Sequence, residues 1–226
     1  MMLRFFILIV FTLSSLSSYA IDSLKSVDAS YIFYYKNMAA GTMDLKINNE
    51  ENKIIASTTY KGNFIASMFG KGSRTEVAQL ERHKNKIMPI NYSYKDNKNT
   101  YNIVFDVTGA SIVSESKDFY LSSKNTLYDP VSLLVVLMYS YPNFNQKYSV
   151  VSKKKLKEYN FSFKDNISYK IGEKIYNVFS AEYNRGRKTN YYFFSKDHKN
   201  LPVSIMVKKD GKEKIRIDLS KIKHIN

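Results

Sequence analysis

The side chains able to do acid–base, nucleophilic or metal chemistry are few and scattered in this sequence of 226 residues. Its histidines, His83, His198 and His224, stand far apart, each in or beside a lysine-rich polar stretch, whereas a metal site needs clustered ligands. The chain has no cysteine, so it offers no thiolate ligand, thiol nucleophile or disulfide. We expect surface histidines, with no metal ion and no other cofactor.

The carboxylates and serines also lack a catalytic pattern. Glu50 and Glu51 are adjacent but fall in a polar turn, and Asp106 precedes a Val-Thr-Gly turn that it would support. Ser67 lies between two apolar residues and outside any Gly-x-Ser-x-Gly elbow, and no phosphate-binding glycine loop is present. The sequence therefore predicts a protein that is not an enzyme.

The sequence is rich in aromatic residues, with 19 tyrosines and 14 phenylalanines. On half-buried strands such side chains pack against their cross-strand neighbours. Alternatively, the inward faces of a curved sheet line an apolar cavity. The candidate lining residues lie in an apolar segment between two glycines and on an apolar helix: Phe64, Met68, Phe69, Leu134, Val135 and Met138.

The elements that would position these residues are one helix and many short strands. Asp129 is suited to cap a helix and Pro130 to occupy its first position, where no N–H is needed. From Leu133 to Met138 the run is apolar on every side, so it must be surrounded by protein. It is too short to span a membrane, which takes about 20 residues. We expect a buried or lidding helix near residues 129–140.

The rest of the chain alternates apolar and polar residues between polar turns such as Asp210-Gly211. This pattern predicts a mainly β fold of about a dozen antiparallel strands in a single domain, residues 21–226, forming a strongly curved sheet or open barrel. Residues 158–164 and 167–171 are expected to be separate short strands. Pro89 is expected to mark a strand's edge or start.

The N-terminus predicts export. A positive start ending at Arg4 precedes an apolar stretch, residues 5–13, and Ser18-Tyr19-Ala20 has small residues where a signal peptidase reads them. Residues 1–20 are thus predicted to be a signal peptide that is cleaved after Ala20. Since no cysteine follows for lipid attachment, we expect a periplasmic protein that is not a lipoprotein.

The charge balance points to anionic surroundings. The formal net charge is +15 and becomes +14 when Arg4 leaves with the signal peptide. A basic protein in the cell envelope is attracted to anionic membrane surfaces and acidic head groups. An exported chain without nucleic-acid motifs is not expected to bind nucleic acid.

Four stretches, in this order and spacing, resemble the DUF3108 family of exported bacterial β-rich proteins of uncharacterised function. They are residues 31–35 with Ala40-Gly41, residues 87–92, Asp129-Pro130 with its apolar helix, and residues 192–195 continuing through 201–203 to the last strand. Asn37 stands where family members often have glycine, and asparagine tolerates the positive φ of such a turn. The resemblance implies no catalytic residues. More loosely, the layout is similar to the LolA and LolB lipoprotein carriers, in which helices lid a curved sheet around an apolar cavity.

Two functions remain open from the sequence. The first is a soluble envelope protein that binds or carries a lipid-like or other apolar ligand. The alternative is a non-catalytic structural or interaction module of the envelope that binds a protein partner.

Overall fold

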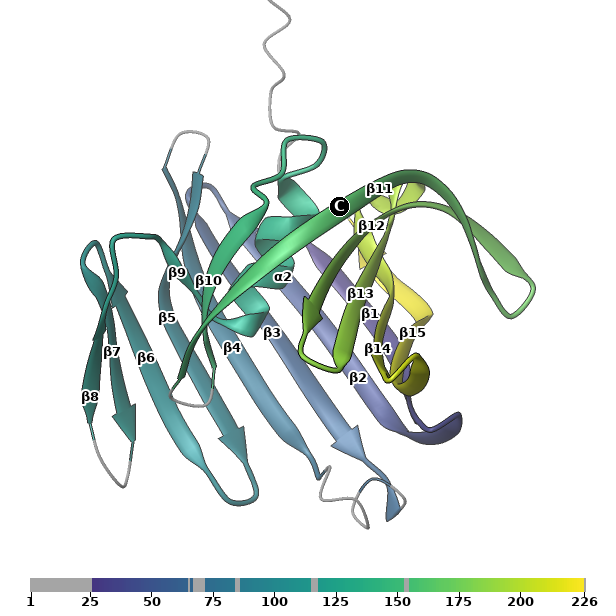
Figure 1. The fold of residues 1–226 in the computed structure, drawn as a ribbon, viewed down its shortest axis with the longest axis horizontal. Coiled ribbons are helices and arrows are strands. Elements are labelled where there is room, and N and C mark those ends of the chain that lie inside the picture. Colours follow the sequence, from purple (N-terminus) through teal and green to yellow (C-terminus); the bar gives the residue numbers. More distant parts are fainter. Residues whose placement is uncertain are drawn as a thin grey trace, which may run out of the picture.

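The described strands form one sheet (Figure 1). Each strand lies beside its neighbours in the sequence, except that the first strand pairs with the last and two consecutive strands in the middle of the chain form the free edges. The computed structural model describes residues 26–64, 66, 72–83, 86–114, 118–152 and 155–225. The predicted signal peptide lies outside this part. The fifteen strands of the described sheet are β1 (Val27–Tyr35), β2 (Met38–Glu50), β3 (Lys53–Gly62), β4 (Arg74–His83), β5 (Lys86–Asp96), β6 (Thr100–Asp106), β7 (Gly109–Ser114), β8 (Phe119–Ser122), β9 (Leu127–Tyr128), β10 (Lys147–Ser152), β11 (Lys155–Ile171), β12 (Lys174–Arg185), β13 (Lys188–Ser195), β14 (Leu201–Lys209) and β15 (Lys212–Ile225).

The first and last strands meet in the middle of the sheet. Strand β1 pairs antiparallel with both β2 and β15, so the free edges belong to β8 and β9, which follow each other in the chain. Every neighbouring pair is antiparallel except β9 with β10. Tight turns make these connections possible: Asn37 has a φ of 65°, and Asp210 and Gly211 also have positive φ. The predicted positive φ at Asn37 and the hairpin at Asp210-Gly211 are therefore confirmed.

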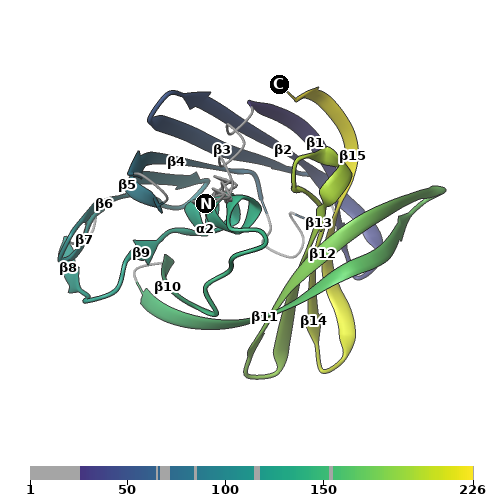
Figure 2. The same ribbon diagram turned by 90° about the horizontal axis from the view of Figure 1, so that it is seen from above.

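The sheet curves around α2 (Pro130–Tyr139), the α-helix that the predicted apolar run forms. Viewed from above, β1–β5 pass on one side of this helix and β10–β15 on the other (Figure 2). The helix contacts β3 and β4 on one side and β10 on the other. Strand β9 contacts β5, so the two halves of the sheet approach each other there, and β6–β8 extend beyond this contact. The predicted mainly β fold, a strongly curved and unclosed sheet with a buried helix, is confirmed. None of the helices among the described residues has the length and hydropathy to cross a membrane.

Alternation decides which side chains face the helix. In β6 the buried residues are Tyr101, Ile103 and Phe105, and the residues between them are exposed. In β1 the buried residues are Val27, Ala29, Tyr31 and Phe33. Because successive side chains of a strand point to opposite faces, one face of the curved sheet and the helix share a single apolar core.

The structure corrects one strand prediction and decides between the alternatives of another. Residues 158–164 and 167–171 belong to one long strand, β11, whose pairing with β12 shifts register between Lys164 and Ile167. Asn166, at a φ of 54°, takes up the irregularity, so the polar pair that suggests a turn forms a bulge instead. Pro89 lies inside β5 rather than at its start, beside a register shift against β4. It precedes the first residue that pairs with β6, so β5 is a local edge there, as one of the two alternatives predicted. The missing N–H of Pro89 therefore breaks no ladder hydrogen bond to β6.

Candidate functional site

The start of α2 is a buried polar site inside the curved sheet. One Asp129 carboxylate oxygen accepts hydrogen bonds from the backbone N–H groups of Val131 and Ser132, both at 2.9 Å. The Ser132 hydroxyl donates to the other oxygen. Asp129 is completely buried, and burial raises the pKa of its carboxyl to about 7. The predicted cap is thus present, and it places a titratable group in the core.

A second carboxylate faces the same core from β4. Glu76 is buried, accepts a hydrogen bond from the Tyr92 hydroxyl at 3.0 Å and pairs with Arg74 Nε at 2.9 Å. Burial, followed by the negative charge of Glu76, raises the pKa of Tyr92, so its hydroxyl remains a donor. Because Glu76 has both a cation and a hydroxyl as partners, this cluster is internally satisfied and offers no open position for a substrate.

The predicted cavity-lining residues fall in three different situations. Leu134, Val135 and Met138 are buried on α2, where every residue from Val131 to Met138 is buried. Phe64 is 78% exposed and stands away from this core. Met68 and Phe69 lie outside the described residues. The structure thus brings the helix residues into the packed core, and Phe64 does not join them.

Aromatic rings occupy the core on the β10–β13 side of the helix. Phe144 stacks on Phe163 with ring centroids 3.9 Å apart, and Tyr141 stacks on Phe179 at 4.5 Å. On the same side of the helix, between β11 and β12, Tyr159 stacks on Tyr183 at 4.2 Å. Stacking at these distances leaves no room for a ligand between the rings. These aromatics act in packing, the first of the two roles considered for them above.

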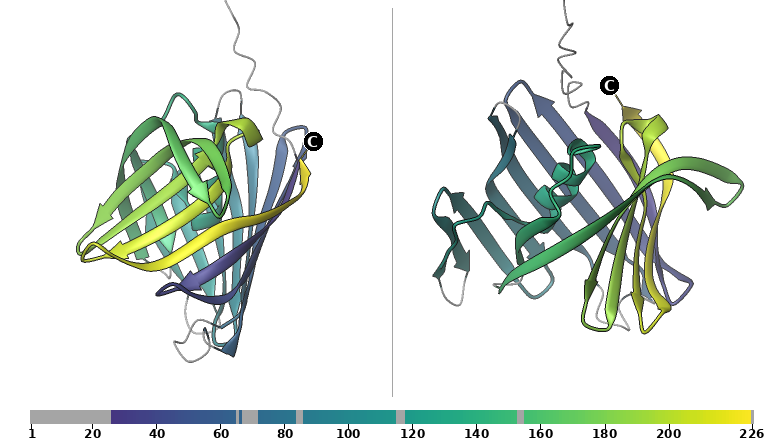
Figure 3. Two further views of the ribbon diagram at one scale, coloured as in Figure 1. Left: turned by 90° about the vertical axis from the view of Figure 1, so that its right-hand side faces the viewer. Right: turned by 45° about the horizontal axis from the view of Figure 1, so that its top comes forward.

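An arm of the β11–β12 hairpin reaches past the end of β13. Val178 is the outermost residue of β12 that pairs with β13, and residues 168–177 continue beyond it as a two-stranded arm. In the left panel of Figure 3 the green arm lies in front of the yellow-green strands. Tyr169 fixes the arm there, because its ring stacks on Phe193 at 4.2 Å and its hydroxyl donates to Ser204 at 3.1 Å.

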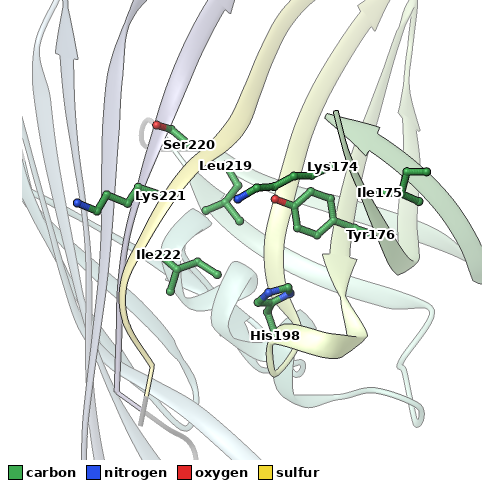
Figure 4. Close-up of a pocket in the computed structure, with 8 residues that line it drawn as sticks. All are labelled: Lys174, Ile175, Tyr176, His198, Leu219, Ser220, Lys221 and Ile222. Carbon is green, nitrogen blue, oxygen red and sulfur yellow. The ribbon is translucent and has the colours of Figure 1, made fainter. Parts of the chain in front are cut away.

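A half-open groove of about 540 Å³ lies between this arm, the 3₁₀ helix η1 (Lys196–His198) and β15 (Figure 4). We call it the rim groove, since η1 begins where β13 ends. Its lining residues are Lys174, Ile175, Tyr176, His198, Leu219, Ser220, Lys221 and Ile222.

The floor of the rim groove is a continuation of the core. Leu219 pairs with Tyr31 and Ile222 with Ala29, and both partners are core residues, so Leu219 and Ile222 share the inward face of β15. Ser220 falls at a register shift between them, and this bulge lets both apolar side chains reach the groove. An apolar surface that the fold leaves open to solvent is a candidate binding surface.

Three polar groups face this apolar floor. Figure 4 shows the Lys174 side chain extended along the groove, with Tyr176 beside it and His198 below Tyr176, whereas Ile175 and Lys221 point away. The His198 ring is held by a hydrogen bond of 2.8 Å between its Nδ1 and the hydroxyl of buried Ser195, and its centroid lies 5.8 Å from that of Tyr176. The groove lining includes no aspartate or glutamate that could orient the histidine, and the Ser195 hydroxyl hydrogen-bonded to the histidine is itself buried, so the arrangement suits binding better than bond making.

Sequence reasoning missed this groove. Its residues come from three segments that only the fold brings together, residues 174–176, 198 and 219–222. His198 was assigned to the surface on account of its lysine-rich neighbourhood, and it lines the groove instead. The alternation around Tyr176 places it on one face of a hairpin, but nothing local indicates what that face meets.

The described residues hold no cluster of three or more His, Cys, Asp or Glu side chains able to bind a metal ion. His83 is exposed and lies 3.1 Å from the Glu81 carboxylate. His224 is exposed near the end of β15. The three histidines are thus held in separate surroundings.

Comparison with known proteins supports the fold. No family model matches the sequence, and no curated protein matches it. Among solved structures, a β-barrel-like protein of the domain of unknown function DUF1849 from Brucella abortus is similar, with a TM-score of 0.56 and 8% identity over 90% of this chain and 98% of that chain. At this identity the likeness concerns the fold alone. The chain therefore shares a β-rich, barrel-like fold with a protein whose function is unknown. Membership of the DUF3108 family stays a prediction.

Proposed function

We propose that this chain is a soluble, exported protein of the cell envelope that binds a lipid-like or other apolar ligand without catalysing a reaction. The observation that carries the proposal is the rim groove, which joins an apolar floor, Leu219 and Ile222, to an opening toward solvent. Its volume of about 540 Å³ falls within the range of about 300–1,000 Å³ that small-molecule sites occupy.

The groove supports this proposal better than the interior around α2 does. The helix residues from Val131 to Met138 are all buried, so a ligand beside Leu134 or Val135 would have to displace packed side chains. The rim groove needs no such rearrangement. We therefore propose that the ligand contacts β15 and the arm rather than the helix residues that the sequence suggested.

The proposed location rests on the sequence. Residues 1–20 have the three parts of a signal peptide, the chain has no cysteine for lipid attachment, and the DUF3108 resemblance adds a family of exported proteins. The formal charge of +14 after cleavage favours contact with anionic membrane surfaces, where amphiphilic ligands are abundant. Osmotic-shock release of a chain beginning at Ile21 is the expected result, and a product retained in the cytoplasm with Met1 intact would contradict the location.

Ligand binding is tested on the mature chain, residues 21–226. Native mass spectrometry after mild purification is expected to detect a bound small molecule, and the protein is expected to take up the neutral apolar dye N-phenyl-1-naphthylamine. Ile222→Gln, in the groove floor, should weaken dye uptake about tenfold, since it places a polar group against the apolar ligand. Val107→Gln is the matched control, because Val107 is 88% exposed and does not line the groove. Absence of any bound molecule and of dye uptake, or equal loss in both variants, would refute the proposal.

A second function, binding of a protein partner, is favoured by the free edge at β8. Among the described strands, β8 pairs with β7 alone, so its other edge presents backbone groups to which an extended segment can add. Val104, Val113 and Tyr120 are exposed on the outer face of β6–β8, next to that edge. A photo-crosslinking residue at Tyr120 should capture a periplasmic protein if this function holds, while the same residue at Lys209 serves as control. Equal labelling at both positions would count against it.

A further inference from the structure

We propose that the rim groove selects amphiphiles with an anionic head, and that Lys174, Tyr176 and His198 form the subsite for that head. The inference rests on the proposed function, because it specifies the ligand of the same groove. It adds a charge preference that an apolar floor alone would not give.

The charge of the lining sets the preference. The lining residues include no aspartate or glutamate, and Lys174 is the lysine among them whose side chain extends along the groove. Paired residues of an antiparallel hairpin share a face, so Lys174, opposite Ile171, and Tyr176, opposite Tyr169, lie on the face of the arm that meets the groove. Lys174 forms no ion pair with any described residue of the chain. An ammonium group beside an apolar floor attracts an anion and repels a cation.

Tyr176 supplies a neutral donor. Its ring is buried against the groove, and burial raises the pKa of the hydroxyl, which therefore keeps its proton. The hydroxyl contributes direction where the lysine contributes charge, because an O–H group donates along one axis whereas an ammonium group attracts from many sides.

His198 completes the subsite in a fixed orientation. The hydroxyl of Ser195 and the ring of Tyr176 hold the imidazole from two sides. When Ser195 donates to Nδ1, the ring proton lies on Nε2, which is then a second neutral donor for an oxyanion. The tyrosine hydroxyl, the ring N–H and the ammonium group are three donors for the oxygens of a carboxylate or phosphate head.

The apolar floor takes the rest of the ligand. Leu219 and Ile222 lie to the left of Tyr176 and His198 in Figure 4 and continue into the core, so an alkyl chain placed there loses water on both sides. Head and tail are thus received by different parts of one groove. Ligands that share this chemistry are fatty acids, with a carboxylate, and phosphorylated lipids, with a phosphate.

The test compares heads on one tail. Dodecanoate and dodecyl phosphate carry anions, 1-dodecanoylglycerol is neutral, and dodecyltrimethylammonium is a cation; each is titrated into the mature protein below its micelle concentration, with displacement of the neutral dye as readout. We expect both anions to bind at least about tenfold more tightly than the neutral ligand. The cation should bind most weakly. The ratio of the two anions then distinguishes a carboxylate ligand from a phosphate ligand.

Lys174→Met tests the subsite, since it keeps the length of the side chain and removes the charge. It should reduce the preference for anions over the neutral ligand to about twofold or less. The matched control is Lys170→Met, because Lys170 pairs with Ile175 and stands on the opposite face of the same arm. Tyr176→Phe and His198→Gln should each lower affinity for the anions about threefold to tenfold.

The outcomes separate this inference from the function beneath it. If no amphiphile displaces the dye and the dye itself does not bind, the proposed function fails and the inference fails with it. If neutral and anionic ligands bind equally, or Lys170→Met and Lys174→Met behave alike, the groove binds apolar ligands but the anionic subsite is wrong. Unchanged thermal unfolding of Lys174→Met shows that a lost preference reflects the missing charge rather than an unfolded arm.

Discussion

Replacing Asp129 with asparagine should make the stability of the protein less dependent on pH. The substitution keeps a side-chain oxygen that accepts the two N–H groups at the start of α2, and it removes a charge from the core. The amide group can donate to the Ser132 hydroxyl, which itself donates to Asp129 in the wild type. The helix cap is therefore preserved while the titration is lost.

The pKa of Asp129 gives the size of the effect. Burial raises this pKa from the ordinary 3.8 to about 7, so the folded state binds a proton that the unfolded state has released. Below pH 4 the carboxyl is neutral in both states; between pH 4 and 7 the wild type loses stability, and above pH 7 the buried carboxylate carries the full cost. At about 1.4 kcal/mol per pKa unit, that cost reaches about 4 kcal/mol.

Urea unfolding at pH 4.5, 6 and 8 measures the cost of charging the Asp129 carboxyl in the folded state. The difference in unfolding free energy, Asp129→Asn minus wild type, should grow by about 2–4 kcal/mol from pH 4.5 to pH 8. Asp106→Asn is the control, because the Thr108 hydroxyl and N–H hold the pKa of exposed Asp106 below its ordinary value. Its difference should not grow with pH. A flat difference for Asp129→Asn would show that charging Asp129 costs nothing in the folded state.

Two further pairs of substitutions test the packing. Gly41→Ala should destabilise the protein by more than about 2 kcal/mol, since an added Cβ would lie 2.3 Å from the Lys61 carbonyl oxygen, whereas Gly172→Ala meets open space and should cost only about 1–2 kcal/mol for its positive φ. Phe179→Ala should cost about 3–5 kcal/mol and Phe64→Ala almost nothing, because Phe179 is buried among stacked rings and Phe64 is exposed. Denaturant unfolding checks both pairs, and equal effects within either pair would contradict the packing described here.

Local chemistry made much of the fold predictable. The Asp129-Pro130 start and the apolar run after it specify a capped helix that must be surrounded, and the structure places α2 inside the sheet. Alternation in β6 specifies which side chains face inward. Asn37 and Asp210-Gly211 specify turns through their tolerance of positive φ. Each of these signals lies within a few residues of the feature that it predicts.

Features that depend on distant partners were not predictable. Asp165-Asn166 has the composition of a turn, yet β12 continues opposite it and makes it a bulge. Pairing of β1 with β15 joins segments from opposite ends of the chain. The rim groove needs both, because the bent hairpin supplies Lys174 and Tyr176 while β15 supplies the apolar floor. A candidate site chosen from apolar sequence runs therefore fell on the helix.

Methyl NMR of the mature protein during titration with dodecanoate tests most directly where the ligand binds. The proposal predicts shift changes at the methyl groups of Leu219 and Ile222, which line the rim groove, and none at those of Leu134 and Val135, which are packed on α2. Changes confined to Leu134 and Val135 would place the ligand in the interior, and no changes at any of the four would contradict ligand binding by this fold.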